Sequence, residues 1–126
     1  MKICVSSSGN TIESKLDPRF GRAAYFVIVD LDTMEAEVIE NSAAASGGGV
    51  GITSGQLMVD KDVKAVVTGN VGPNAMNVLS AASIEVYRGE AASVKENAEK
   101  YKAGQLQKIN NSVSAHSGMR GQGGSR

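Results

Sequence analysis

The chain has 126 residues and a mass of 13.0 kDa, which gives room for one domain with a single hydrophobic core. Its 13 basic and 13 acidic residues cancel, so no overall field draws it to nucleic acid, an anionic membrane or acidic substrates. The single cysteine excludes an intramolecular disulfide and a thiolate cage for a metal.

The N-terminal third predicts a buried strand followed by a β-hairpin. Residues 3–5 are a short apolar run closed by the polar loop 6–10, which is typical of a strand buried on both faces. Aromatic and β-branched residues fill 25–29, turn formers follow at 30–33, and partial alternation returns at 35–39. We expect the second strand of this hairpin, polar on one face, to lie at a sheet edge.

The strand-like pattern starts at Lys2 and the longest apolar runs are only a few residues. This leaves no space for a signal peptide or a membrane span, so we expect a cytoplasmic protein.

The middle of the chain alternates loops, helices and strands. A glycine-rich loop ends near residue 51, and helical spacing of apolar residues over 52–59 predicts a short helix. Residues 63–67 form the next buried strand. The pair Gly72-Pro73 then predicts a helix start with proline at its first position.

The last elements of the body are a strand over 84–87 and a helix over 94–103 that ends at Gly104. On that helix the spacing of Glu96 and Lys100 predicts an ion pair.

Beyond residue 109 the sequence changes character. Residues 110–126 contain no acid, and their large apolar side chains are Val113 and Met119, too few to offset the entropy of ordering. We therefore expect one folded domain over 1–109 and a disordered, mildly basic Gly/Ser-rich tail over 110–126.

The predicted order of elements is β, β, β, α, β, α, β, α, so the second half requires parallel strands joined by right-handed crossovers. This indicates a three-layer α/β domain with a five-stranded mixed sheet in the order 3-2-1-4-5. The connections after the first and fourth strands diverge, and open α/β sheets bind ligands in the crevice at such a point. Loops 6–10 and 68–74 would rim this crevice.

Several chemistries lack the residues that they need. The one histidine, His116, falls in the predicted tail, so no fixed base is available for a nucleophilic triad. Asp30 and Asp32 flank the hairpin turn, where capping explains them better than a metal-binding pair. No P-loop motif is present, and the glycines near residue 49 match the dinucleotide fingerprint poorly, so a dinucleotide cofactor is weakly supported.

The remaining candidates are backbone amides and arginines. Glycine-rich loops that lead into helices can bind an anion, although glycines also serve simply for tight turns. Arg19 and Arg22 bracket Phe20-Gly21, and they either turn into the crevice or lie on the solvated surface. Cys4, inside a central strand, fits a small core residue better than a metal ligand.

Four segments taken together resemble the dinitrogenase iron-molybdenum cofactor biosynthesis family, which includes NifX-like proteins and the carboxyl-terminal part of NifB. They are DPRFGRAAYF at 17–26, EN at 40–41, GGVG at 48–51 and TGNVGPNA at 68–75. Their order and spacing are more specific than any one of them, and the similarity covers roughly the folded body.

The resemblance implies a ribonuclease H-like αβα fold and a role in holding a metal-sulfur cluster rather than catalysis. Family members often carry a histidine before the Phe-Gly pair, where this chain has Arg19, and ahead of the glycine run, where it has Gly47. No metal ligand or catalytic residue is therefore assigned. The predicted cluster-binding residues are Ser7, Arg19, Phe20, Gly21, Arg22, Gly48, Gly49, Gly51, Gly69, Asn70, Gly72 and Asn74.

Two functions from different classes follow. The first is a stand-alone, non-enzymatic carrier of an anionic metal-sulfur cluster, such as one related to the iron-molybdenum cofactor, with a cluster donor or acceptor protein as partner and no nucleic acid or membrane. The second is a small-anion or nucleotide-binding regulatory module that uses the same crevice. A vestigial nuclease would need an acidic cluster on the first strand, and that strand has no acid.

Overall fold

The structure is a computed structural model that describes residues 1–41 and 50–109, and over 50–53 the backbone alone. The predicted tail at 110–126, and Gly48 and Gly49 of the glycine-rich loop, lie outside the described residues.

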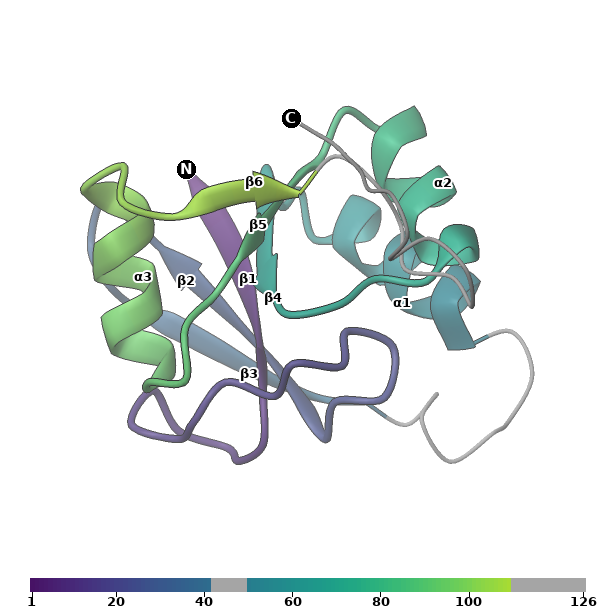
Figure 1. The fold of residues 1–126 in the computed structure, drawn as a ribbon. Helices are drawn as coiled ribbons and strands as arrows, with labels where there is room; N and C mark the ends of the chain where they lie inside the picture. The colour runs from purple at the N-terminus through teal and green to yellow at the C-terminus, as the bar shows by residue number, and fades with distance from the viewer. Residues whose placement is uncertain (42–49, 110–126) are drawn as a thin grey trace.

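A single mixed sheet runs through the domain (Figure 1). Its strands are β1 (Lys2–Ser7), β2 (Tyr25–Asp30), β3 (Ala36–Glu40), β4 (Ala65–Thr68), β5 (Glu85–Arg88) and β6 (Gln107–Ile109). The order is β3-β2-β1-β4-β5-β6, with β1 antiparallel to β2 and parallel to β4. The predicted order of the first five strands is confirmed, and β3 lies at an edge as expected.

The prediction of five strands is wrong, because β6 adds a sixth beside β5. It pairs antiparallel with β5 through Val86↔Ile109, Tyr87↔Lys108 and Arg88↔Gln107. The sequence at 107–109 is Gln-Lys-Ile, which has neither an apolar run nor a strand-like alternation long enough to detect. Pairing with the neighbouring strand, a long-range contact, creates this element.

Helices cover both faces of the sheet. The helices α1 (Val50–Asp60) and α2 (Pro73–Ala81) lie together on one face, and α3 (Val94–Lys102) lies on the other, as Figure 1 shows. The predicted three layers are therefore confirmed.

Alternate residues of the central strands enter two separate cores. Cys4 and Leu79 belong to the core beneath α1 and α2, whereas Val5 and Val94 belong to the core beneath α3, and all four are 0% exposed. Full burial of one such aliphatic side chain contributes about 1.5–3 kcal/mol. The packing interpretation of Cys4 is confirmed.

Residues at the ends of the helices and strands explain where most of these elements begin and end. Gly72 is the N-cap of α2, with proline following it, and Gly104 beyond α3 has a φ of +74°, a conformation that glycine adopts without strain. The Asp30 carboxylate accepts a hydrogen bond from the Asp32 amide at 2.9 Å, as a turn cap does.

The predicted ion pair between Glu96 and Lys100 is not formed. The Glu96 side chain instead accepts from the Ser93 amide in a capping box, and Lys100 Nζ lies 3.6 Å from Glu90. The helix N-terminus offers Glu96 unpaired backbone donors, and these win over an exposed lysine one turn away.

No helix in the described part of the chain is both long and apolar enough to cross a membrane.

Candidate functional site

A short segment after β1 crosses the carboxyl ends of β1 and β4. We call residues 17–20 the strap. Asp17 N–H donates to the Ser6 carbonyl at 2.9 Å, and the Ser6 hydroxyl donates to the Asp17 carbonyl and shares a hydrogen bond of 2.7 Å with Thr68 Oγ1. Ser6 and Thr68 are both 0% exposed, so the strap is attached to the sheet by buried polar groups.

The strap also pairs with the loop after β4. The amides of Gly69 and Asn70 both donate to the Pro18 carbonyl, at 3.1 and 2.6 Å, and the Phe20 amide donates to the Asn70 carbonyl at 3.1 Å. A Cβ on Gly69 would lie 2.6 Å from Pro18 Cβ, so glycine is required here by close approach. The expectation that Gly69 and Asn70 offer free amides to a ligand does not hold, because the strap uses both.

Asp17 fixes the position of Arg19. The guanidinium of Arg19 makes a bidentate contact with the Asp17 carboxylate, in which Nε donates to Oδ1 and Nη2 donates to Oδ2, both at 3.1 Å. The Arg19 backbone amide also donates to Oδ1, at 3.0 Å. The Asp17 side chain is 7% exposed and that of Arg19 is 64% exposed. The side-chain hydrogen bonding to Asp17 and the negative charge of its carboxylate raise the pKa of the Arg19 guanidinium above its ordinary value.

Two further arginines lie at the same end of the sheet. We call Arg19, Arg22 and Arg88 together the arginine edge. Arg22 is exposed and follows the strap, and Arg88 ends β5 with Nη1 3.4 Å from the Gly69 carbonyl. Within 1–41 and 50–109, neither makes an ion pair.

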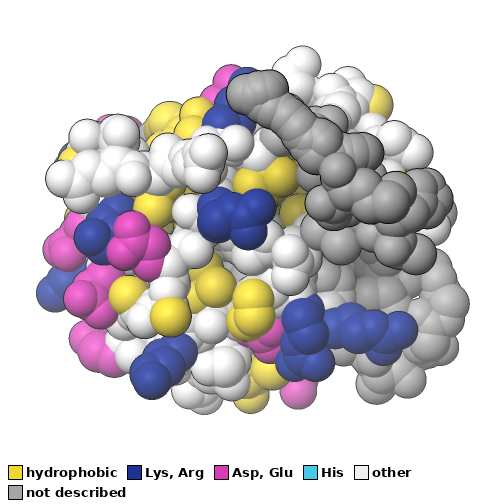
Figure 2. All heavy atoms as spheres, viewed as in Figure 1, with side chains coloured by type: hydrophobic (Ala, Val, Ile, Leu, Met, Phe, Trp, Pro, Cys, Tyr) yellow, Lys and Arg dark blue, Asp and Glu magenta, His cyan; other side chains and the backbone are white. Residues whose placement is uncertain are grey.

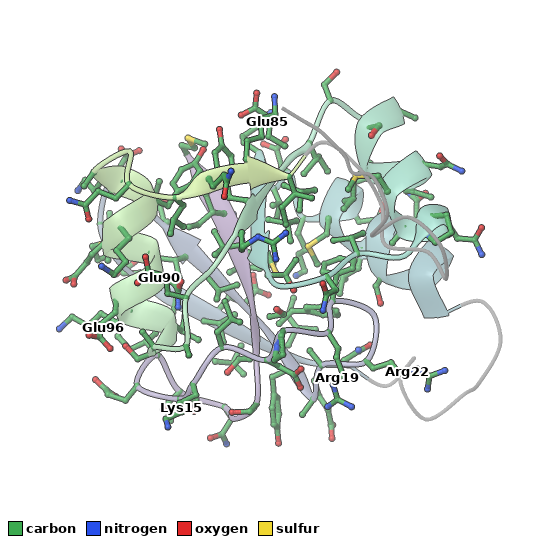
Figure 3. The ribbon with its side chains drawn as sticks, in the orientation of Figure 1. Lys15, Arg19, Arg22, Glu85, Glu90 and Glu96 are labelled. Carbon is green, nitrogen blue, oxygen red and sulfur yellow. The ribbon has the colours of Figure 1, made fainter. Side chains whose placement is uncertain are left out.

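Figure 3 shows Arg19 and Arg22 projecting outward from the segment after β1, and Figure 2 shows Lys and Arg side chains exposed on this part of the surface. Arg19 is compensated by Asp17, so Arg22 and Arg88 supply the uncompensated positive charge. The arginine edge can therefore attract an anion at the surface.

Phe20 packs in the core, and the carbonyl of Gly21 is hydrogen-bonded to a buried side chain. Phe20 is 1% exposed, and its ring centroid lies 5.3 Å from that of Phe26 in the core. The side chain of Asn41, 8% exposed, donates to the carbonyls of Gly21 and Ala23 at 3.1 and 2.8 Å. Burial makes Phe20 the anchor of the strap, and its contact with a ligand stays a prediction.

The N-terminus of α2 is the part of the loop that remains open. Gly72 has no side-chain cap, Pro73 has no N–H, and no described residue accepts from the amides of Asn74 and Ala75. A Cβ on Gly72 would meet nothing within 4 Å. These two amides lie at the positive end of the α2 dipole without an acceptor among the described residues, and they come shortly after Asn70, which bridges to Arg19.

Ser7 and Gly51, which are also predicted site residues, lie at the end of β1 and at the start of α1. Ser7 is 0% exposed, and its hydroxyl donates to the Gly9 carbonyl at 2.7 Å and accepts from the Gly9 amide at 3.2 Å. These bonds hold the turn after β1. Gly51 lies in the first turn of α1.

The described residues offer no ordinary metal cage. They contain no group of three or more His, Cys, Asp or Glu side chains placed to hold a metal ion. Burial raises the pKa of the Cys4 thiol, so this cysteine stays protonated and is unsuited to act as a thiolate ligand. A ligand at this surface would be held by charge and by amide donors.

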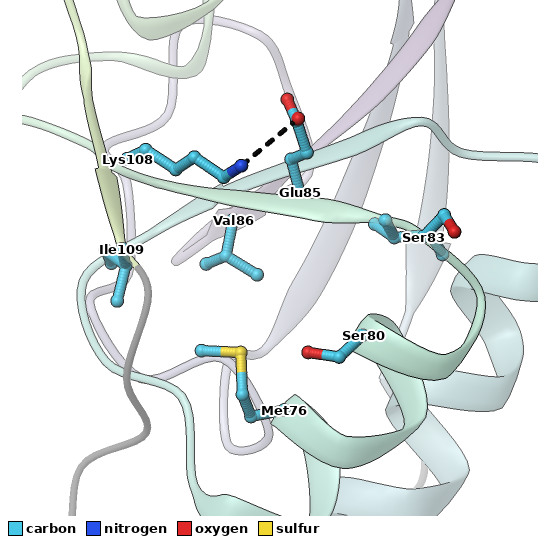
Figure 4. Close-up of a pocket in the computed structure, with 8 residues that line it drawn as sticks. Met76, Ser80, Ser83, Glu85, Val86, Lys108 and Ile109 are labelled. Carbon is cyan, nitrogen blue, oxygen red and sulfur yellow. Dashed lines mark hydrogen bonds and ion pairs between the residues drawn. The ribbon is translucent and has the colours of Figure 1, made fainter.

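A second hollow, between α2 and the β5–β6 pair, lies at the other end of the parallel strands. Its volume is about 320 Å³, and Met76, Val86 and Ile109 form its apolar wall (Figure 4). Its charged groups, Glu85 and Lys108, are paired with each other at 3.2 Å. It therefore lacks the free positive charge of the arginine edge.

Sequence reasoning missed Asp17, Arg88 and Asn41 as parts of this surface. Asp17 and Asn41 lie within the segments that carry the family resemblance, but their roles depend on contacts across the fold. Arg88 had a usable signal, since it ends β5, a strand that runs parallel to β4 and whose carboxyl end lies beside that of β4.

Comparisons with known proteins agree with this geometry. A family model described as dinitrogenase iron-molybdenum cofactor matches residues 1–104. An uncharacterized protein of Methanocaldococcus jannaschii is 35% identical over 112 residues, covering 86% of this chain and 92% of the relative.

Solved structures agree as well. The apo form of the orange protein from Desulfovibrio gigas has a TM-score of 0.84 and 34% identity, covering 90% of this chain and 96% of that one. A Thermotoga protein named as a candidate NifB has a TM-score of 0.80 and 33% identity, covering 90% and 97%.

Proposed function

This chain belongs to the dinitrogenase iron-molybdenum cofactor family, and on that premise we propose that it is a non-enzymatic carrier of an anionic metal-sulfur cluster. The cluster is cargo, bound at the arginine edge and the open N-terminus of α2 and passed between a donor and an acceptor protein. The proposal includes the cytoplasmic location and the ribonuclease H-like class that the family resemblance implies.

The observation that carries the proposal is the arginine edge itself. Three guanidinium groups, those of Arg19, Arg22 and Arg88, lie at one end of the sheet against the single buried carboxylate of Asp17. Arginine donors make charge-assisted hydrogen bonds to anionic acceptors, and these bonds are stronger than neutral ones. The sulfide surface of a cluster with net negative charge fits such donors.

The α2 N-terminus supplies the second kind of donor. Its unpaired amides at Asn74 and Ala75 need an acceptor that no described residue provides. Because Gly72 has open space where a side chain would be, a bulky anion can approach the backbone there.

Anaerobic reconstitution tests the proposal. We expect the protein, incubated with tetrathiomolybdate or with ferrous iron and sulfide, to retain a charge-transfer absorption band through gel filtration. A colourless, metal-free protein under all of these conditions contradicts the proposal.

Arginine variants test whether the cluster binds at the arginine edge. Arg22→Ala and Arg88→Ala each remove one charge-assisted contact, so each is expected to weaken retention about tenfold at unchanged stability. Lys15→Ala is the matched control, because Lys15 is exposed on the loop after β1 and makes no ion pair with a described residue. Arg19→Ala is less suitable, since it also leaves the buried Asp17 carboxylate without its partner. If Lys15→Ala weakens retention as much as the arginine variants do, the arginine edge is not the site.

A small-anion or nucleotide-binding module is the second candidate, favoured by the uncapped N-terminus of α2 alone. Phosphate or a nucleotide bound there would raise the melting temperature in the absence of any metal. Metal-free stabilisation by inorganic phosphate or by ATP, without colour after reconstitution, would favour this function over cluster transport.

A further inference from the structure

Another cavity, of about 420 Å³, opens at the opposite end of β1 from the arginine edge. Its walls come from the start of the chain, the end of α3 and the loop between α3 and β6, which lie side by side in Figure 1. Cavities of this size are large enough for a small organic molecule. The carrier function proposed above makes no use of it.

The walls of this cavity are aromatic and aliphatic. The rings of Tyr87 and Tyr101 meet edge to face, with centroids 4.9 Å apart and planes at 83°, and Leu31 and Leu106 line the same space. Leu31 is 7% exposed. The Tyr87 hydroxyl donates to Glu85 Oε1 at 2.8 Å, which orients the ring and raises the pKa of Tyr87 to about 12.

Two positive charges lie at the cavity wall, and the Met1 ammonium is already paired with Asp32 at 3.1 Å, which leaves Lys102. Lys102 Nζ donates to the Leu31 carbonyl at 3.1 Å, which holds the ammonium over the apolar space. In the part of the chain that the structure describes, Lys102 makes no ion pair, whereas Lys100 and Lys108 are paired with Glu90 and Glu85. An ammonium has three donors, so two remain for an acceptor.

We propose that this cavity binds a small aromatic monocarboxylate. The ring of the ligand lies against Tyr101 and Leu106, and its carboxylate accepts from Lys102 Nζ. A mostly apolar cavity with one polar group that fixes orientation is the usual form of a small-molecule site. Edge-to-face contact with tyrosine stabilises a bound aromatic ring, and the carboxylate supplies the negative partner that Lys102 lacks among the described residues.

The chain's own tyrosines can report the binding. It has no tryptophan and three tyrosines, of which Tyr87 and Tyr101 line the cavity. In a Tyr25→Phe background, the tyrosine fluorescence therefore comes from the cavity alone. We expect a saturable change on titration with 3-phenylpropionate and a much smaller one with its neutral analogue, 3-phenylpropionamide.

Two lysine variants isolate the role of charge. Lys102→Met keeps most of the side-chain volume and is expected to weaken 3-phenylpropionate binding about tenfold, the loss typical of one charge-assisted hydrogen bond. Lys95→Met is the control, because Lys95 is exposed on the same face of α3 about 10 Å earlier along the helix. Its binding should match that of the Tyr25→Phe parent.

Each other outcome overturns the proposal. A linear, non-saturating fluorescence change means that the cavity holds no such ligand. Equal binding of acid and amide, or an unchanged affinity in Lys102→Met, removes the role of the charge. Circular dichroism melting of every variant verifies that the fold is kept, so an affinity change is not read from unfolded protein.

Discussion

The helices α2 and α3 begin on opposite faces of the same sheet, and the backbone amides of their first turns differ in whether they are hydrogen-bonded. At α3, the Ser93 hydroxyl accepts from the Glu96 amide at 3.0 Å and Glu96 Oε1 accepts from the Ser93 amide at 3.1 Å. At α2, Gly72 provides no side-chain cap and the amides of Asn74 and Ala75 have no described acceptor.

This difference separates amides used for folding from amides available for binding. The capping box of α3 satisfies donors that would otherwise cost stability, typically about 1 kcal/mol for the cap residue. The start of α2 lacks that contribution and lies beside the arginine edge. The chain thus has a less stabilised helix start at the place where an anion would benefit from it.

The largest expected effect comes from Gly69→Ala, which tests where the fixed part of the loop before α2 ends. The new Cβ would meet backbone and side-chain atoms of Pro18 at 2.6–2.8 Å, so we expect a loss of about 2 kcal/mol in the free energy of unfolding. Gly72→Ala, with open space around it, should change stability by less than about 0.5 kcal/mol. Urea unfolding of both variants measures the contrast, and equal losses would contradict it.

Gly72→Asp makes the start of α2 resemble that of α3. An aspartate N-cap should accept from the open amides and add a few tenths of a kcal/mol of stability over glycine. Its negative charge and the lost donors should weaken retention of the tetrathiomolybdate product about tenfold. Retention equal to that of Gly72→Ala would place the cargo away from α2.

Ser93→Ala makes the start of α3 resemble that of α2. Removal of the hydroxyl that accepts from the Glu96 amide should cost about 1 kcal/mol in thermal or urea unfolding and leave cluster retention unchanged. Ser80→Ala, at an exposed position of α2 where the side chain makes no described hydrogen bond, should cost nothing measurable. A loss of cluster retention in Ser93→Ala would mean that the two helix starts are not independent.

The smallest effect concerns acid pH. The hydrogen bonds with Ser93 lower the pKa of Glu96 below its ordinary value of 4.5. The contribution of its charged form is therefore present above pH 4.5 and is lost as the pH falls through the lower folded-state pKa. Glu96→Gln keeps an acceptor at this position without the titration, so the difference in melting temperature between wild type and variant should shrink from pH 6 to pH 3. A constant difference would show that the charge of Glu96 contributes nothing.

Much of the architecture could be predicted from local signals. The apolar run at Ile3–Val5, the hairpin that follows and the Gly72-Pro73 helix start each lie within a few residues of chain and each formed as expected. The family resemblance was also readable from the sequence, because it depends on the order and spacing of residues.

Other features depended on which segments meet in space. The strand β6 exists because its three residues pair with β5, and nothing in Gln-Lys-Ile indicates a strand. Glu96 accepts a hydrogen bond in the helix cap and does not pair with Lys100, because the backbone amide of Ser93 is held in place next to it whereas the Lys100 ammonium is mobile.

The candidate site divides in the same way. The sequence by itself determined that arginines and glycine loops would have to replace a thiolate cage, since it contains one cysteine, and Cys4 is placed in a buried strand. Only the tertiary structure decided that the strap takes the amides of Gly69 and Asn70, that Phe20 is buried and that Arg88 joins the edge. The physical reason is that a backbone donor is free or occupied according to what packs against it, and the strap reaches the β4 loop from about 50 residues away along the chain.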